Sequence, residues 1–313
     1  MKASIAIPRS DLPSIRSSGR TALRVVILML LLALAGYAGL GAYVADRIST
    51  AERHPVVEVP TTFGLAYEPV RFNSAVDKVS LDGWYLDSPG KKVIVMLHGW
   101  NGNRSEGDTA MPVARALVDH DYDVLMFDFR GHGESGAARM SLGQYETRDV
   151  AGALEYLRER GVDQVGVIGW SLGANTAVNA APGLPGMRAI VADSVWAELD
   201  PVLARKFTYY TGLPQIFVPA TIWSGKLLYG IDVQSNRPAR ALSALGERPV
   251  LLIHGQQDDF IPVSNAYALQ KAAANNPNFS LWVVPGTGHT RAYHEQPAQF
   301  IRRMLSFYDL YLD

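Results

Sequence analysis

An uncharged stretch of 21 residues near the start of the chain restricts its folding more than any other feature. It covers residues 25–45 and reads VVILMLLLALAGYAGLGAYVA. As an α-helix it would be about 30 Å long, which matches the hydrocarbon core of a bilayer. Charged side chains border it on both sides: Arg24, Asp46 and Arg47. We therefore predict a membrane-spanning signal anchor at 25–45, between a basic tail at 1–24 and a linker at 46–65.

The charge on either side of this stretch predicts its direction in the membrane. Residues 1–24 contain five Lys or Arg and one Asp, a net charge of +4, whereas residues 46–313 carry a net charge of −5. Because basic flanks stay in the cytoplasm, we expect a cytoplasmic N-terminus and an extracytoplasmic body, periplasmic in a Gram-negative cell. A cleaved signal peptide is one alternative. The apolar region of a signal peptide is shorter and ends at an A-x-A-like cleavage site, whereas the candidate site at Ala45 has the bulky Tyr43 in place of the first alanine. A buried core helix is the other alternative, but the length of the uncharged stretch and the charges that flank it disfavour this interpretation.

Strand and helix patterns alternate along the rest of the chain, from about residue 66. Apolar runs of strand length occur at 76–86, 93–97, 124–129, 165–169, 189–193, 250–254 and 280–284. Helical patterns lie between them, at 109–120, 142–160, 172–180, 263–274 and 297–312. Most of the later strand runs are apolar throughout, as in strands covered on both faces. We predict one α/β domain at 66–313, a mostly parallel central sheet with helices on both faces.

Two segments depart from this alternation. The first strand run contains Asp82 and Gly83, which favours an antiparallel hairpin at the edge of the sheet. The second segment, residues 195–246, has several aromatic side chains and prolines but no clear strand. Long structureless loops are uncommon in compact domains, so we expect a helical insertion. Its position beside strand ends makes it a candidate cap over a binding pocket, and a packed excursion without that role is the alternative.

The pentapeptide Gly169-Trp170-Ser171-Leu172-Gly173 carries the strongest chemical signal. It follows an apolar strand and precedes a helical pattern, which is the context of a G-x-S-x-G nucleophile elbow. The glycines permit a turn too sharp for larger side chains, so that the serine hydroxyl projects above the sheet. The helix that follows directs its positive end toward developing negative charge. We predict that Ser171 is a nucleophile.

A serine hydroxyl needs a base that removes its proton, and seven histidines are available. His289 lies in a loop after the last strand, which ends at the same edge of the sheet as Ser171. His294 is the nearest competitor, but it heads the final helix, where a solvated role is expected. We predict His289 as the base.

The base needs an acid that holds its tautomer. A strand end at 254 leads into His254-Gly255-Gln256-Gln257-Asp258-Asp259, which supplies two adjacent carboxylates. We choose Asp258, with Asp259 as its rival and Asp193, at the end of the preceding strand, as an outside candidate. The predicted order along the chain is serine, aspartate, histidine, as expected for a nucleophile elbow of this kind.

The negative oxygen of a tetrahedral intermediate needs hydrogen-bond donors. We expect one to be the backbone N–H of Leu172, directly after the nucleophile. The loop after the first parallel strand contains His98-Gly99-Trp100, and the N–H of Trp100 is the expected second donor. His98 is expected to order this loop by hydrogen bonds, and the Trp100 indole is a candidate wall of the acyl pocket.

Other classes of protein find little support. The absence of cysteine excludes disulfides, thiolate nucleophiles and Cys-based zinc sites. A mildly acidic body offers no basic patch for nucleic acid. The glycine-rich loop at 128–135 matches neither G-x-G-x-x-G nor G-x-x-x-x-G-K-[ST], and His132 has no companions at metal-ligand spacing. We therefore expect no metal, no organic cofactor and no nucleic-acid partner.

Six segments occur in the order LHGWNGNRSEG, FDFRGHGES, GWSLG, ADS, HGQQDDFIP and GTGH. In these segments the chain resembles the α/β-hydrolase superfamily over nearly all of 66–313, and in particular bacterial hydrolases of the serine aminopeptidase-like branch, which often carry a membrane anchor. The resemblance implies that Ser171 is the nucleophile, Asp258 the acid and His289 the base. It also implies that Trp100 and Leu172 supply the oxyanion amides. Esterases, thioesterases, lipases and peptidases share the fold, so the substrate stays open.

These observations predict a membrane-anchored serine hydrolase that cleaves a carboxylic ester or related acyl bond through an acyl-serine intermediate. Its expected partners are a small-molecule acyl substrate and the membrane. The aromatic insertion suggests an apolar acyl group, and the anchor brings lipid within reach. The alternatives are a serine peptidase or aminopeptidase, an acyltransferase, and a non-catalytic membrane-tethered binding protein. Haloalkane dehalogenation is excluded, since it needs a carboxylate at position 171.

Overall fold

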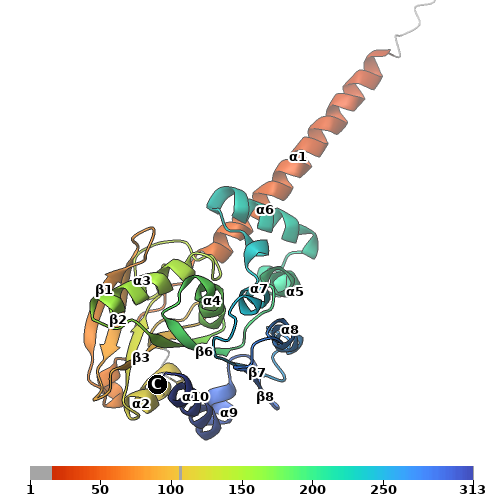
Figure 1. The fold of residues 1–313 in the computed structure, drawn as a ribbon. Coiled ribbons are helices and arrows are strands. Elements are labelled where there is room, and N and C mark those ends of the chain that lie inside the picture. The colour runs from red at the N-terminus through yellow and green to blue at the C-terminus, as the bar shows by residue number, and fades with distance from the viewer. Residues whose placement is uncertain (1–15, 106–107, 313) are drawn as a thin grey trace, which may run out of the picture.

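The computed structural model describes residues 16–105 and 108–312, and a mixed β-sheet forms the centre of this part of the chain (Figure 1). The eight strands follow one another across the sheet in the order β1-β2-β4-β3-β5-β6-β7-β8. Their bounds are β1 (Glu68–Asn73), β2 (Ser80–Leu86), β3 (Lys92–Leu97), β4 (Tyr122–Phe127), β5 (Val165–Trp170), β6 (Met187–Asp193), β7 (Val250–Gly255) and β8 (Phe279–Val284). Strands β3 to β8 run parallel, and only the β1–β2 and β2–β4 pairs are antiparallel. The predicted α/β architecture is confirmed.

Helices cover both faces of the sheet. One face carries α3 (Glu146–Glu159), α4 (Leu172–Ala180) and α8 (Ser264–Ala272), and the other carries α2 (Ala110–Val118), α9 (Ala292–Glu295) and α10 (Pro297–Tyr311). Each helix buries an apolar stripe: in α10, Phe300, Met304 and Tyr308 recur at every fourth position. Strands β4, β5 and β7 are buried along their whole length, which explains their continuous apolar runs.

The antiparallel hairpin lies at the edge of the sheet as predicted, but its bounds differ from the prediction. Strand β1 is a separate strand, and the turn to β2 covers residues 74–79, where Lys78 has a φ of 54°. Asp82 and Gly83 lie inside β2 and not in a turn. A Cβ on Gly83 would lie 2.6 Å from the Met126 carbonyl oxygen, so this glycine permits the close approach of β4.

The segment between β6 and β7 is helical. It contains α5 (Leu199–Thr211), the 3-10 turn η3 (Gln215–Phe217), α6 (Val218–Tyr229), η4 (Val233–Ser235) and α7 (Pro238–Ser243). We call residues 195–246 the cap segment. In Figure 1 its helix α6 lies across the end of the first helix of the chain that is nearest the domain.

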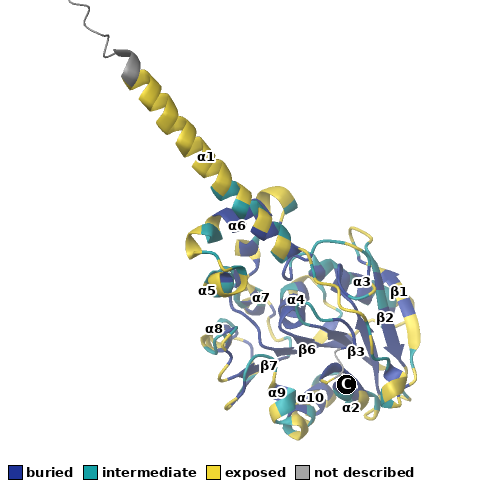
Figure 2. Ribbon diagram, turned by 180° about the vertical axis from the view of Figure 1, so that it is seen from behind, coloured by how far each residue is buried: buried dark blue, intermediate teal, exposed yellow. Residues whose placement is uncertain are grey.

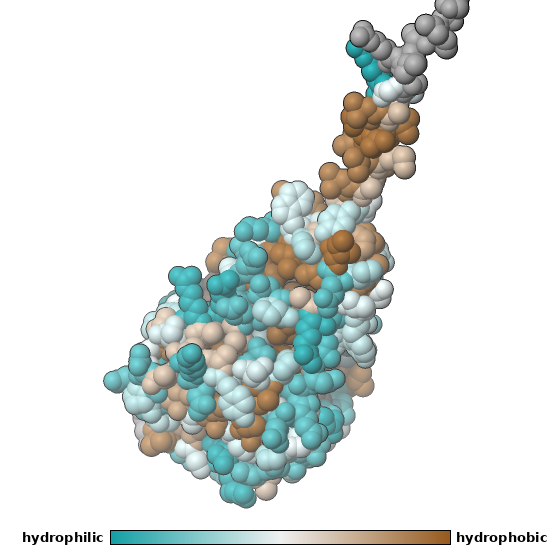
Figure 3. All heavy atoms as spheres, turned by 90° about the vertical axis from the view of Figure 1, so that its right-hand side faces the viewer, coloured by the Kyte–Doolittle hydropathy of each residue, from teal (hydrophilic) through white to brown (hydrophobic). Residues whose placement is uncertain are grey.

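The first helix, α1 (Arg16–Ser49), projects from the domain (Figure 1). It extends beyond the predicted 25–45 at both ends, and residues 1–15 of the predicted basic tail lie outside the described residues. Its stretch Gly19–Ser49 is, within the described residues, the one helix long and apolar enough to cross a membrane. Leu23 and Leu34 are 61% and 62% exposed, so this apolar surface has no protein cover (Figures 2 and 3).

The end of α1 nearest the domain packs against the cap segment. A Cβ on Gly41 would lie 2.6 Å from the Ala220 Cβ, so α1 and α6 cross almost backbone to backbone. The Tyr37 hydroxyl donates to the Ile216 carbonyl at 2.7 Å. Asp46 pairs with Arg139 at 2.7 Å, outside the cap segment. The apolar helix is therefore joined to the domain by defined contacts.

Candidate active site

Ser171 occupies the sharp turn between β5 and α4. Its φ of 49° and ψ of −111° are rare for a residue with a side chain. A Cβ on Gly169 would lie 2.5 Å from the carbonyl carbon of Gly173, and a Cβ on Gly173 would lie 2.2 Å from the Leu97 carbonyl oxygen. Both glycines are therefore required for the chain to pass through this turn, which is the strained geometry of a nucleophile elbow.

Ser171, His289 and Asp258 form one hydrogen-bonded row. Ser171 Oγ lies 3.0 Å from His289 Nε2, and His289 Nδ1 lies 2.7 Å from Asp258 Oδ2. Since a carboxylate only accepts, Nδ1 carries the proton and Nε2 is left to accept from the serine hydroxyl. The imidazole is about one quarter exposed, whereas the Asp258 carboxylate is buried. The structure thus brings together the three side chains that the sequence predicted as nucleophile, acid and base.

Backbone amides orient the Asp258 carboxylate. Its Oδ1 accepts from the N–H of Phe260 at 2.9 Å and from the N–H of Ile261 at 2.7 Å, which leaves Oδ2 directed at the imidazole. The rival carboxylate of Asp259 is 87% exposed, and its only charged neighbour at close range in the described chain is Lys206, at 3.5 Å. The structure therefore places Asp258, and not Asp259, in contact with the imidazole.

The competing histidine lies outside the row. His294 Nε2 lies 2.9 Å from the hydroxyl oxygen of Thr109 and 3.5 Å from a carboxylate oxygen of Asp108. These partners belong to the segment that leads into α2. The structure does not bring His294 to the nucleophile.

The end of β6 contacts both the serine and the histidine loop. The Asp193 carbonyl accepts from the Ser171 N–H at 2.9 Å. The Ser194 hydroxyl donates to Asp193 Oδ1 at 2.9 Å and accepts from the Thr290 N–H at 3.1 Å. Ser194, for which the sequence predicted no role, therefore tethers the residue that follows His289. The sequence feature that could have indicated this role is the position of Ser194 in the segment ADS, directly after a strand end.

The loop after β3 lies against the nucleophile. A Cβ on Gly99 would lie 3.9 Å from the Ser171 Cβ. Burial lowers the pKa of His98 to about 3, so this side chain is neutral. Its Nε2 accepts from the Phe129 N–H at 2.9 Å, and its Nδ1–H donates to the Gly99 carbonyl at 2.8 Å. His98 thereby orders this loop, and Leu172 begins α4, where helix amides lack acceptors within the helix.

A hollow of about 480 Å³ opens over Ser171 and His289. Aromatic side chains form much of its wall: Trp100, Trp170, Tyr210 and Phe260. The Phe260 ring lies 4.9 Å from the His289 ring and 5.9 Å from the ring of Tyr210, which belongs to α5. The cap segment therefore contributes a wall of the hollow over the nucleophile.

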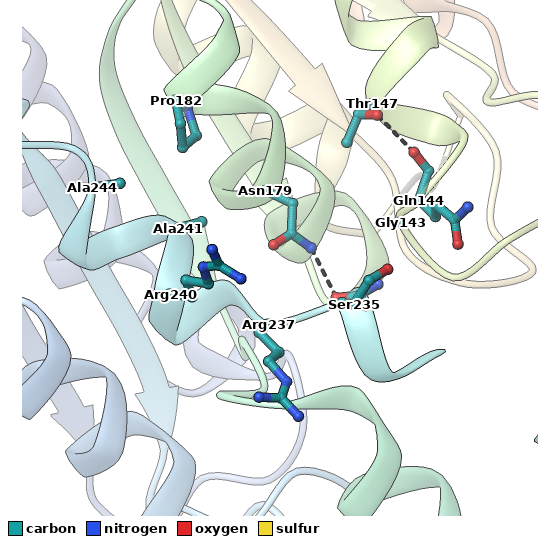
Figure 4. Close-up of a pocket in the computed structure, with 11 residues that line it drawn as sticks. Gly143, Gln144, Thr147, Asn179, Pro182, Ser235, Arg237, Arg240, Ala241 and Ala244 are labelled. Atoms are coloured by element: carbon teal, nitrogen blue, oxygen red, sulfur yellow. Dashed lines mark hydrogen bonds between the residues drawn. The ribbon is translucent and has the colours of Figure 1, made fainter. Parts of the chain in front are cut away.

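A second hollow lies apart from this site, where α4 and α7 face the loop before α3 (Figure 4). Its wall contains both polar and apolar side chains, among them Arg237 and Arg240. The Asn179 side chain donates to Asn236 at 2.8 Å, and the Thr147 hydroxyl donates to the Gln144 carbonyl at 2.7 Å. Its described lining includes neither a carboxylate nor an imidazole, the groups that serve as general bases.

Comparison with known proteins agrees with this geometry. A model of the alpha/beta hydrolase family matches residues 94–303. The chain belongs to this family. Among its relatives, the uncharacterized protein YqkD of Bacillus subtilis is 28% identical over 71% of this chain and 72% of its own length. The uncharacterized protein Rv2307c of Mycobacterium tuberculosis is 31% identical over 68% of this chain and 69% of its own length.

Solved structures resemble this alpha/beta hydrolase over most of its length. The esterase Pf2001 of Pyrococcus furiosus superposes with a TM-score of 0.72 at 26% identity, over 85% of this chain and 99% of the esterase. The esterase EaEST of Exiguobacterium antarcticum superposes with a TM-score of 0.58 at 18% identity, over 76% of this chain and 98% of its own. The likeness to EaEST shows the fold, whereas family membership and the likeness to Pf2001 support hydrolase activity on a small molecule.

Proposed function

We propose that this alpha/beta hydrolase is a membrane-anchored serine hydrolase that cleaves carboxylic esters or related acyl bonds through an acyl-serine intermediate. The observation that carries the proposal is the row of contacts from Ser171 Oγ to His289 Nε2 and from His289 Nδ1 to Asp258. A buried, amide-oriented carboxylate behind an imidazole is the arrangement that activates a serine. The likeness to the esterase Pf2001 of Pyrococcus furiosus supports an ester substrate.

Acylation follows from this arrangement. Ser171 Oγ attacks the carbonyl carbon of the ester while His289 Nε2 takes the hydroxyl proton. The tetrahedral oxyanion accepts hydrogen bonds from the N–H groups of Leu172 and Trp100, and each such donor contributes roughly 3–4 kcal/mol to the transition state. The bond to the leaving alcohol then breaks, His289 returns the proton to that alcohol, and an acyl-serine remains.

Deacylation repeats the same steps with water. His289 Nε2 takes a proton from a water molecule as its oxygen attacks the acyl carbon, and the same two amides hold the second oxyanion. When this intermediate collapses, Ser171 Oγ leaves with the proton from His289 and the carboxylic acid departs. Asp258 stays ionised and stabilises the imidazolium in both halves of the reaction.

The wall of the hollow favours an uncharged acyl ester over a peptide with a free amino group. Four aromatic rings line it, and the carboxylate that reaches it, Asp259, has the Lys206 ammonium 3.5 Å away. An aminopeptidase needs a carboxylate without such a partner to hold the substrate ammonium. The lining therefore supports the ester hydrolase more than the aminopeptidase.

The exposed apolar helix α1 supports a membrane anchor at its residues 25–45. Its lipid-length apolar surface is uncovered, and basic residues precede it. We infer that the N-terminus is cytoplasmic and that the hydrolase domain, residues 66–313, lies on the far side of the membrane.

The proposal is tested with the full chain in detergent and a p-nitrophenyl butyrate substrate. We expect a burst of p-nitrophenolate followed by steady turnover. Replacement Ser171→Ala is expected to remove the burst and to lower kcat by at least about a thousandfold, with an unchanged melting temperature. The control Ser243→Ala changes an exposed serine of α7 and retains activity. Turnover that survives in Ser171→Ala refutes the proposal.

A further inference from the structure

Helix α6 of the cap segment exposes large apolar side chains and buries small residues. Trp223, Leu227 and Leu228 are each more than half exposed. The buried residues of the helix are Ala220, Thr221, Ser224 and Gly225. A surface helix of a water-soluble domain has the opposite arrangement, with its large apolar side chains against the core. The distribution on α6 is that of a helix whose outer face lies in an apolar medium.

The sequence around α6 is uncharged as well. Residues 207–225, a run of 19 residues that includes the 3-10 turn η3, contain no charged side chain. Ile216 in η3 is exposed like the large side chains of α6. We call residues 215–228 the cap tip. Its exposed surface is therefore apolar over η3 and most of α6.

The contact between α6 and α1 has the features of a helix pair within a membrane. A Cβ on Gly41 would lie 2.6 Å from the Ala220 Cβ, and a Cβ on Gly225 would lie 4.0 Å from the Ala45 Cβ. Gly41 and Ala45 are four positions apart on α1, so both lie on the face that meets α6. Pairs of small residues at this spacing let helices in lipid approach closely, where van der Waals packing drives their association.

The contacts along α1 give the depth of α6 when residues 25–45 span the bilayer. At 1.5 Å per residue, Tyr37 lies about 12 Å inside the outer end of this stretch. Its hydroxyl donates to the carbonyl of Ile216, just before α6, at 2.7 Å. Asp46, one residue beyond the stretch, accepts from the hydroxyl of Tyr229, at the end of α6, at 3.1 Å. Helix α6 therefore leads from within the outer leaflet to the membrane surface.

Charged and aromatic groups lie at the level where α6 reaches that surface. Arg139 pairs with Asp46 at 2.7 Å, and its guanidinium lies 3.7 Å from the centroid of the Tyr229 ring. Lys226, the charged residue of α6, pairs with Asp232 at 2.8 Å, beyond the end of the helix. Tyrosine and basic side chains are typical of the boundary of a membrane, where long basic side chains reach toward water. The polar groups thus occur where the depth along α1 places the lipid headgroups.

We propose that the exposed face of the cap tip inserts into the outer leaflet of the membrane beside α1. Its partner is the lipid of the bilayer that α1 crosses, because apolar surface continues from α1 onto the part of the domain next to it (Figure 3). The proposal rests on the membrane anchor of the proposed function and goes beyond it. Two helices instead of one then hold the domain, and the cap segment that lines the hollow over Ser171 is fixed relative to the bilayer.

Single-cysteine labelling tests this placement, since the natural chain contains no cysteine. The full chain is prepared as Trp223→Cys, Leu227→Cys, Leu32→Cys and Leu310→Cys, and each thiol is joined to an environment-sensitive fluorophore. Leu32 is exposed on α1, and Leu310 is exposed on α10, away from α1 (Figure 1). The labelled proteins are placed in phosphatidylcholine nanodiscs, which are open to water on both sides. Unchanged melting temperatures show that the variants are folded.

Two quenchers report the surroundings of each label: iodide in the water and a nitroxide lipid in the bilayer. We expect the nitroxide lipid to quench the labels at positions 32, 223 and 227. Iodide is expected to quench these three labels at least about threefold more weakly than the label at position 310, because an anion does not enter hydrocarbon. The label at position 310 is quenched by iodide and not by the lipid.

Three other patterns overturn the proposal and differ in what they leave standing. If the label at position 32 lies in lipid but iodide quenches those at 223 and 227, the anchor holds and the cap tip lies in water. If the labels on the cap tip are protected from iodide but not quenched by the nitroxide lipid, a protein surface such as a second copy of the chain covers it. If iodide quenches the label at position 32, the anchor fails together with the cap-tip placement, whereas ester hydrolysis at Ser171 is tested separately by turnover.

Discussion

Asp258 and Asp259 are neighbours in sequence but differ in every contact relevant to catalysis. Asp258 is buried, accepts from two backbone amides and contacts His289, whereas Asp259 is 87% exposed beside Lys206. We expect Asp258→Asn to lower kcat for p-nitrophenyl butyrate by about a thousandfold or more, because the imidazole then loses its orienting acceptor. Asp259→Asn is expected to change kcat by no more than about threefold, since exposed pairs contribute little. Equal losses in the two variants would show that the acid is misassigned.

Asp193 is a buried carboxylate beside the row. Burial raises its pKa to about 7, its Oδ1 accepts from Ser194, and its Oδ2 has no partner in the described chain. In the unfolded chain an aspartate loses its proton near pH 4. Between about pH 4 and 7 the folded protein therefore binds the extra proton, so its stability falls as the pH rises through this window and levels off above it.

The neutral substitution Asp193→Asn is expected to remove this dependence. Its melting temperature relative to the natural protein is predicted to rise between pH 5 and pH 8, because the variant has no carboxylate to ionise at position 193. Melting curves of the full chain in detergent at both pH values measure this difference. Asp163→Asn, at an exposed position, is the control. If the two variants have the same pH dependence, the buried proton of Asp193 is not responsible.

The sequence predicted those site residues whose surroundings are set by neighbours along the chain. Ser171 was identifiable because its strand, glycines and helix are contiguous, and His289 because it follows a strand end. The choice between Asp258 and Asp259 depends on which carboxylate meets the Phe260 and Ile261 amides, a matter of loop geometry. The position of Asp258 as the first aspartate of the segment QQDDF, in its resemblance to the family, nevertheless favoured the residue that contacts the imidazole.

The crossing of α1 and α6 is the contact that joins the apolar helix to the cap segment. A Cβ on Gly41 would lie 2.6 Å from the Ala220 Cβ, whereas nothing lies within 4 Å of a Cβ on Gly39. We expect Gly41→Leu to separate the helices and to destabilise the cap segment by about 1–3 kcal/mol. Gly39→Leu, two residues earlier, is expected to have little effect.

Limited proteolysis and thermal melting of the full chain in detergent measure this difference. We predict a lower melting temperature and faster cleavage in the cap segment for Gly41→Leu alone. The contact between α1 and α6 is not important in solution if the two leucine variants behave alike.

Secondary-structure patterns predicted the buried elements better than the edge. Strands β3 to β8 were found because most of their runs are apolar throughout. Strand β1 was missed, since its edge position leaves only Val70 and Phe72 buried and its other four residues exposed. Asp82 and Gly83 resemble a turn, but packing against β4 determines their conformation instead. Gly83 does mark a position where a side chain is not tolerated, but the reason is the close contact between β2 and β4 and not a turn.

At the scale of the whole molecule, the charge on the two sides of α1 predicts the topology. In a Gram-negative host, protease added to intact spheroplasts is expected to digest the hydrolase domain, because the basic flank keeps the N-terminus inside. A cytoplasmic marker protein must survive the same treatment. A protected domain contradicts the orientation, and a domain released into the soluble fraction indicates cleavage of the apolar segment.

Local sequence patterns could not predict which distant segments of the chain pack together. No sequence feature marks Ile48 and Ile222 as neighbours, yet both line the same two small cavities between α1 and the cap segment. Such contacts arise when α1 and α6 pack together, and the energetic reason is burial of apolar area, which many aliphatic side chains could provide. The sequence therefore predicted a helical insertion without predicting that α1 packs against it.

The most direct test of the account is the position of a covalent label. The full chain in detergent is treated with a fluorophosphonate, digested and mapped by mass spectrometry, and the same is done for His289→Ala. We predict a phosphonyl group on Ser171 that is nearly absent in His289→Ala, because the hydroxyl is not activated without the imidazole. A label on another residue, or equal labelling of Ser171 in both proteins, would contradict the central claim.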